Sequence, residues 1–208
     1  MSDRLLDLSG KHDLTEEEVE EFYMLQDEQE LRDSIRKILE SIDGTPLRHQ
    51  LLETPNRVVK AMSEIFDGYQ VDIDSLFTSF DGEGKDQIVV VKDIETWSVC
   101  EHHLLPFHLQ VAVAYLPFDR VIGVSKIERL VHAYAHRLQL QERITEQVAN
   151  TLMDKLRPQG VGVIIEGEHL CMRMRGVKGT GKVVTSVMLG EFRESPGLRQ
   201  ELLGVLRK

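Results

Sequence analysis

Cysteine occurs only twice in the 208-residue chain, and each cysteine lies beside histidine. The first is in Cys100-Glu-His-His103 and the second is in His169-Leu-Cys171. A thiolate and an imidazole three residues apart can bind one metal ion, and a third ligand from a distant segment would tie two parts of the fold together. Soft sulfur with borderline nitrogen favours zinc, and three protein ligands leave a fourth position for water. The sequence therefore predicts a fold that brings Cys100, His103 and Cys171 around one zinc ion.

Three other interpretations of these residues compete with the metal site that leaves a position for water. For an isolated Cys-x-x-His pair, a buried cysteine beside a satisfied histidine is the commoner arrangement. Here Glu101 and His102 fall inside the pair and the apolar run Leu104–Phe107 follows it, which a plain core does not explain. A disulfide is disfavoured, because no signal peptide precedes the cysteines and a reducing cytosol is expected. His102 or His169 as a fourth protein ligand would give a closed structural site, and this alternative stays open.

Charge and hydropathy exclude several classes of function. Lys plus Arg number 25 and Asp plus Glu 35, a formal net charge of −10 that argues against general binding to nucleic acid or membranes. No apolar stretch approaches the roughly 18 residues of a membrane span, so we expect a soluble, cytoplasmic protein. An anionic small-molecule ligand is compatible with this charge, because basic residues gather near the second cysteine: Arg173, Arg175, Lys178 and Lys182.

Apolar spacing divides the chain into three predicted regions. We expect a polar tail and an acidic helix capped by Thr15 in residues 1–30, and a helical region in residues 31–86. Residues 87–208 form the predicted catalytic domain. Within it we expect strands over 88–91 and 111–115, two helices, two more strands over 161–165 and 183–189, and a terminal helix over 198–206. Ser125 with Glu128 has the pattern of a capping box. This order of elements predicts an α+β fold.

Four ordered motifs resemble those of the GTP cyclohydrolase I family. The similarity begins at about Ile35 and continues to the terminal helix, and it leaves about the first thirty residues without a counterpart. The motifs are Ser98–Phe107, Gly123–Lys126 with Arg129, Gln141–Thr145, and His169–Met172 with Arg175–Val177, preceded by the matching stretch Leu52–Val58.

The resemblance implies an enzymatic activity, against which two alternatives stand. It implies zinc-dependent hydrolytic opening of the guanine imidazole ring of GTP, release of C8 as formate, rearrangement of the ribose, and closure to 7,8-dihydroneopterin triphosphate, the first step of folate or another pterin synthesis. A pterin or deazapurine enzyme with altered chemistry is disfavoured, because the Cys-His-Cys set and Glu142 are complete. A non-catalytic nucleotide-binding or regulatory oligomer with a structural zinc is the alternative from another class.

The matched residues acquire roles by the same resemblance. Cys100, His103 and Cys171 match the zinc ligands. His102 matches the acid/base that assists ring opening at N7, and His169 matches a second proton-transfer group.

The remaining matched residues are expected to bind substrate. Glu142 matches the carboxylate that pairs with the guanine N1–H and 2-amino edge, and Gln141 matches a neighbouring pocket residue. The triphosphate is assigned to Ser125 at a helix start and to three cations, Lys126, Arg129 and Arg175.

The resemblance also implies an architecture. The family has the tunnelling fold, which predicts a four-stranded antiparallel sheet with helices on one side and an N-terminal helical extension. Its subunits pool their sheets into a barrel, and two five-membered rings stack into a decamer with active sites between subunits. The expected partners are therefore GTP and further copies of this chain. One departure leaves local geometry open: His108-Leu-Gln110 stands where the family usually has a glycine-containing turn.

Overall fold

The N-terminal unit is helical, as the spacing of its apolar residues predicts. The computed structural model describes residues 28–77, 79–81 and 87–206, so the predicted Thr15 cap lies outside the described residues. Helix α2 spans Glu28–Asp43 and α3 spans Thr54–Ile65, with the 3-10 turn η1 (His49–Leu51) between them and η2 (Asp67–Gln70) after them.

The chain divides into two compact units, and the second begins at Val71. The predicted catalytic domain begins later, at residue 87. The difference arises from residues 71–77, which include the 3-10 turn η3 (Asp74–Leu76) and pack on the core of the second unit through Val71, Ile73, Leu76 and Phe77.

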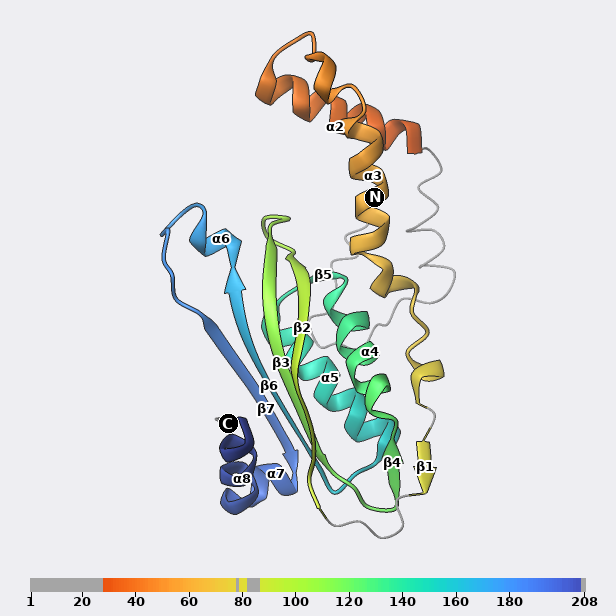
Figure 1. Ribbon diagram of the computed structural model, residues 1–208, viewed down its shortest axis with the longest axis vertical. Coiled ribbons are helices and arrows are strands. Elements are labelled where there is room, and N and C mark those ends of the chain that lie inside the picture. Colours follow the sequence, from red (N-terminus) through yellow and green to blue (C-terminus); the bar gives the residue numbers. More distant parts are fainter. Residues whose placement is uncertain (1–27, 78, 82–86, 207–208) are drawn as a thin grey trace, which may run out of the picture. The chain divides into compact units, whose positions relative to one another are not determined.

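A long sheet forms the centre of the second unit (Figure 1). Its strands are in the order β5-β2-β3-β6-β7, and β2, β3, β6 and β7 pair antiparallel as predicted. The prediction of four strands omits β5, which has two residues and pairs parallel with the end of β2. A separate two-stranded ribbon joins β1 and β4. The strands are β1 (Ser79–Asp81), β2 (Val89–Cys100), β3 (Pro106–Leu116), β4 (Arg120–Ile122), β5 (Leu138–Gln139), β6 (Gly160–His169) and β7 (Val183–Gly190).

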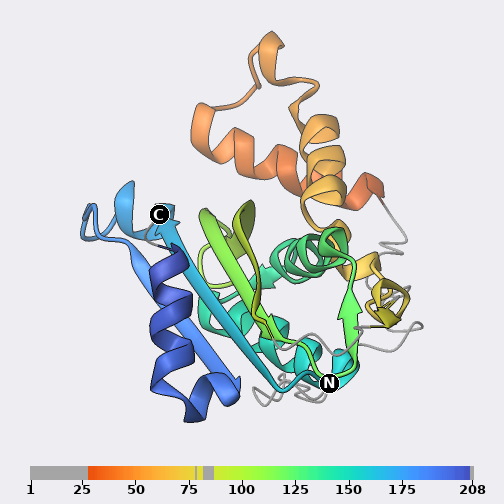
Figure 2. The ribbon, with the colours of Figure 1, turned by 60° about the horizontal axis from the view of Figure 1, so that its bottom comes forward.

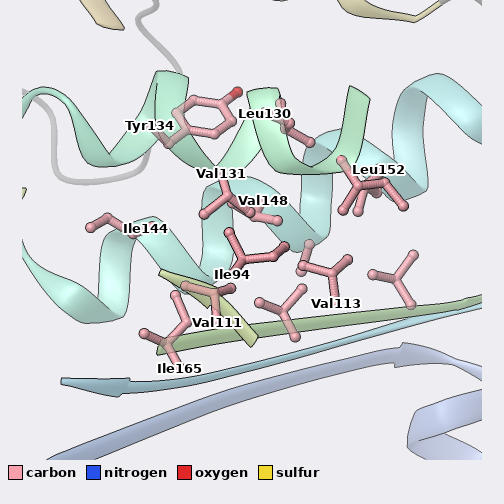
Figure 3. Close-up of a cluster of buried hydrophobic side chains, with 14 of the residues drawn as sticks. Ile94, Val111, Val113, Leu130, Val131, Tyr134, Ile144, Val148, Leu152 and Ile165 are labelled. Carbon is pink, nitrogen blue, oxygen red and sulfur yellow. The ribbon is translucent and has the colours of Figure 1, made fainter. Parts of the chain in front are cut away.

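Two helices, α4 (Val124–Ala135) and α5 (Gln141–Leu156), cover one face of this sheet. Alternate residues of a strand point to the same face, so Val111 and Val113 of β3 and Ile165 of β6 meet the apolar sides of both helices. Figure 3 shows this core, with Leu130 and Val148 among the helix residues that fill it. The core fixes the sheet and the two helices as one frame.

The opposite face is partly covered by the C-terminal helices, which corrects the prediction of helices on one side only. After β7 the chain turns through α7 (Glu191–Glu194) into α8 (Pro196–Leu206), and Figure 2 shows α8 lying along the sheet. Phe192 and Leu202 pack against Ala114 of β3. Gly162 leaves room for this packing, because a Cβ there would lie 2.9 Å from Leu202 Cδ2.

The predicted capping box of α4 is wrong. The helix begins at Val124, Gly123 is its N-cap, and no side chain caps it. Ser125 is consequently the second residue inside the helix, because the chain enters α4 directly from β4. None of the helices in the described part of the chain is long and apolar enough to span a membrane.

Candidate metal centre and active site

The candidate site lies at one end of the sheet, where β2 ends, β3 begins and β6 ends (Figure 1). Cys100 is the last residue of β2, as predicted, and His102 and His103 lie in the turn that leads to β3. A tight turn folds this segment back, since the backbone N–H groups of His103 and Leu104 both donate to the Cys100 carbonyl. The short helix α6 (Leu170–Arg173) follows β6 and holds Cys171 at the same end.

The three predicted metal ligands come together. Ligand atoms of Cys100, His103 and Cys171 all lie within 4.8 Å of one another, and Cys100 Sγ is 3.9 Å from His103 Nδ1. Two sulfurs and one imidazole nitrogen are a donor set that suits zinc. Within the described residues, this is the only such group of three or more histidine, cysteine or acidic side chains.

The two sulfurs of the triad formed by Cys100, His103 and Cys171 oppose each other's ionisation. Burial and the neighbouring Cys100 sulfur both raise the pKa of the Cys171 thiol, and Arg175 opposes them only weakly. Two thiolates so close together repel unless positive charge lies between them, and a metal ion supplies that charge. The residues present therefore fit a metal ion held by two cysteines and one histidine.

An ion pair ties the metal-binding turn to helix α5. Arg143 Nη1 and Nη2 donate to the two carboxylate oxygens of Glu101 over 2.6 and 3.1 Å. This pairing lowers the pKa of Glu101, chiefly through the hydrogen bonds from Arg143. Because Glu101 lies between Cys100 and His102, the pair holds both residues against the N-terminal turn of α5.

Gln141 and His169 form a second contact between α5 and the sheet. Gln141 is buried, and its Oε1 lies 2.8 Å from His169 Nε2. The His169 ring also stacks on Phe107, with ring centroids 4.5 Å apart and an angle of 6° between the planes. Burial lowers the pKa of His169, and the carboxylate of Glu142 opposes that shift. The predicted second proton-transfer group is thus a held, partly exposed imidazole.

The predicted guanine-binding and acid/base residues border this group. Glu142 is exposed in the first turn of α5 and lies near enough to His169 to influence its charge. His102 is exposed, with its ring centroid 6.1 Å from that of His103 in an edge-on arrangement. Both side chains are therefore open to a ligand at the triad.

The predicted phosphate-binding residues fall into two places. Arg175 lies at the triad, where its Nη1 is 3.3 Å from His103 Nε2. Ser125, Lys126 and Arg129 lie in the first half of α4, which follows the other end of β3. The eleven residues of β3 extend about 35 Å, and α4 returns only about 18 Å over its length. One chain therefore does not gather all four residues around its own triad.

The departure at His108-Leu-Gln110 does not disturb the site. These residues continue β3, and His108 lies on the face of the sheet opposite to Phe107, with its ring 4.9 Å from that of Trp97. Gln110, Glu166, Glu168 and Lys182 are its neighbours on that face.

Comparison with known proteins identifies the family. The sequence model of GTP cyclohydrolase I matches residues 31–207. The chain belongs to the GTP cyclohydrolase I family. GTP cyclohydrolase 1 of Homo sapiens is 49% identical over 172 residues, which cover 82% of this chain and 69% of that protein. The prediction of a GTP cyclohydrolase is thereby confirmed.

Bacterial members of the family are similar to a comparable extent. GTP cyclohydrolase 1 of Synechococcus sp. (strain JA-2-3B'a(2-13)) is 46% identical over 177 residues, covering 84% of this chain and 77% of that protein. The enzyme of Caldanaerobacter subterraneus subsp. tengcongensis is 45% identical over 182 residues, covering 86% of this chain and 97% of that protein. The similarity therefore spans nearly the whole of this relative.

Sequence reasoning missed two groups at the site. Glu101 and Arg143 lie inside the first and third of the matched motifs, but no role was predicted for them, although their opposite charges were a usable signal. The stacking of Phe107 on His169 had no local signal, because it depends on the register of β3 with β6.

Proposed function

We propose that this chain, with zinc held by Cys100, His103 and Cys171, hydrolyses GTP to formate and 7,8-dihydroneopterin triphosphate. The observation that carries the proposal is the convergence of the three ligand atoms within 4.8 Å at the end of the sheet where His102, His169 and Glu142 also lie. When bound by three protein ligands, zinc keeps a position for water and lowers the pKa of that water towards neutrality.

The side chains around the triad divide the remaining work of the reaction. His102 and His169 move protons during opening of the imidazole ring and rearrangement of the ribose. The exposed carboxylate of Glu142 accepts hydrogen bonds from the guanine N1–H and 2-amino group, and adenine would leave these oxygens unpaired. Arg175, beside His103, contributes positive charge for the triphosphate.

Assembly would supply the rest of the triphosphate site. We propose that Ser125, Lys126 and Arg129 act on substrate held at the triad of a neighbouring copy, in a homo-oligomer built as a decamer of two stacked pentamers. Support comes from the position of these residues along α4, away from the triad of their own chain. The N-terminal end of α4 also favours phosphate, because the positive end of the helix dipole lies there.

The proposed reaction is tested by incubating zinc-loaded protein with GTP and measuring the fluorescence of the oxidised pterin. We expect fluorescence that a chelator abolishes and added zinc restores. Retained fluorescence in protein shown to be metal-free would overturn the zinc dependence. No fluorescence from oligomeric, metal-replete protein would leave a non-catalytic nucleotide-binding protein as the better account.

A further inference from the structure

The amide of Gln141 has only one orientation that satisfies its surroundings. Its Nε2 lies 3.0 Å from the carbonyl oxygen of Ile165, 3.0 Å from that of Val183 and 3.2 Å from Thr185 Oγ1. Carbonyl oxygens only accept hydrogen bonds, so the nitrogen must face them. A flipped amide would place its oxygen against two other oxygens in a buried site, which is costly. The amide oxygen therefore faces His169.

This orientation determines where the proton lies on the His169 ring. Gln141 Oε1 is 2.8 Å from His169 Nε2, and an amide oxygen can only accept. His169 Nε2 must therefore carry hydrogen and donate it. In the neutral ring, Nδ1 is then the nitrogen with a free lone pair.

The surrounding chain is shaped to keep Gln141 in this place. Gly167 of β6 lies directly against the amide, and a Cβ there would be 2.1 Å from Gln141 Oε1. Phe107 holds the plane of the imidazole by stacking. Gln141 itself is 1% exposed, so it has almost no surface with which to touch a substrate.

We propose that Gln141 is a positioning residue that holds His169 in the Nε2–H tautomer and so presents Nδ1 to the reacting substrate. This inference rests on the proposed function, because it assigns His169 a part in the reaction. It gives Gln141 a role different from the substrate contact that the sequence predicts: Gln141 acts on the reaction through His169.

The test compares Gln141→Met with Gln139→Met, both in zinc-loaded protein. Gln139 is an equally buried glutamine whose Nε2 donates to the Tyr134 carbonyl and to Gln147, and it makes no bond to His169. Its Oε1 accepts a long 3.5 Å bond from Arg143, so both variants are assayed at saturating zinc, where a change in zinc affinity does not alter kcat. For Gln141→Met we expect kcat to fall more than tenfold while KM changes by less than about twofold, because transition-state proton transfer is lost and ground-state binding is not. For Gln139→Met we expect loss of stability with kcat within about twofold of the unsubstituted protein.

Gly167→Ala gives a second variant in case Gln141→Met fails to fold. It keeps every hydrogen-bonding group and displaces the amide from His169, so kcat should fall in the same direction. Unchanged kcat in both variants would overturn the proposal. A raised KM at unchanged kcat would show that the Gln141 amide contacts the substrate instead. An equal loss of kcat in Gln139→Met would show that Gln141 contributes only to stability.

Solid-state NMR of protein labelled with 15N-histidine gives a readout that does not need turnover. The His169 signal, assigned by its loss in His169→Asn, should show hydrogen on Nε2 and should change in Gln141→Met. Hydrogen on Nδ1 of the unsubstituted protein would overturn the inference. If that protein makes no pterin, the proposed function fails, and the tautomer still decides whether Gln141 orients the ring.

Discussion

Arg143 and Glu101 are joined by two parallel hydrogen bonds that connect the metal-binding turn to the start of helix α5. The side chains are 26% and 25% exposed, so the pair is shielded from water more than a surface ion pair is. Its two-pronged geometry fixes direction as well as distance. The turn that presents His102 and His103 is thereby aligned with Gln141 and Glu142.

Breaking this pair should loosen the metal site. In Glu101→Gln and in Arg143→Met we expect zinc affinity to fall by roughly tenfold, the effect typical of groups that orient metal ligands. The double variant should bind zinc no more weakly than either single variant, because the partner is already unpaired. Zinc affinity is measured by competition with a chromogenic chelator. Losses that add in the double variant would show that the two residues do not act as a pair.

Removal of a metal ligand should abolish zinc retention and turnover together. We expect this for Cys171→Ala and for His103→Ala, because two remaining ligands do not hold the ion against dilution. Zinc is measured by elemental analysis after gel filtration, and turnover by pterin fluorescence. His102→Ala is the matched control, which should retain zinc and lose ring opening. An active, metal-free Cys171→Ala protein would remove that cysteine from the ligand set.

Glu142 should determine the preference of the protein for guanine over adenine nucleotides. In Glu142→Ala the guanine N1–H and 2-amino group lose a charged acceptor, and a hydrogen bond to a charged group contributes about 1.5–3 kcal/mol. We therefore expect GTP binding to weaken by roughly one to two orders of magnitude, with a smaller change for ATP. Both affinities are measured by calorimetry on zinc-loaded protein that carries His102→Ala, which is expected to bind GTP without opening its ring. Equal affinity for GTP with and without Glu142→Ala would show that guanine is recognised by other residues.

Mixing two inactive variants should restore activity if the site is shared between subunits. His103→Ala removes the triad, and Arg129→Ala removes a cation of α4, so each homo-oligomer lacks one part of every site. In a mixed oligomer, some sites would combine an intact triad with an intact α4. We expect turnover to recover after the two variants are unfolded and refolded together, and to remain absent when they are refolded apart. No recovery in verified mixed oligomers would place both residues in sites of one chain.

Local patterns predicted the main strands and the position of the first metal ligand. Alternation around Val111 and Val113 predicted the strand that contains them, whereas the strand expected over 88–91 continues in the structure to Cys100. Features that depend on a distant segment were not predictable in this way. The packing of α8 depends on Ala114 and Gly162, which leave room on the other face of the sheet.

The orientation of Gln141 was equally beyond local reasoning. The resemblance to the family suggested that Gln141 is a pocket residue. Its burial depends on the carbonyl groups of Ile165 and Val183 and on the space at Gly167, which only the pairing of β6 with β7 brings together. The same pairing prevents the amide from reaching solvent.

The most direct test of the whole account follows the fate of the guanine C8 atom. Zinc-loaded protein is incubated with GTP carrying 13C at C8, and labelled formate and the pterin product are quantified together. The account predicts one labelled formate for each pterin formed, and neither product from His103→Ala. Pterin or formate made at an unchanged rate by His103→Ala, or GTP consumed without labelled formate, would contradict it.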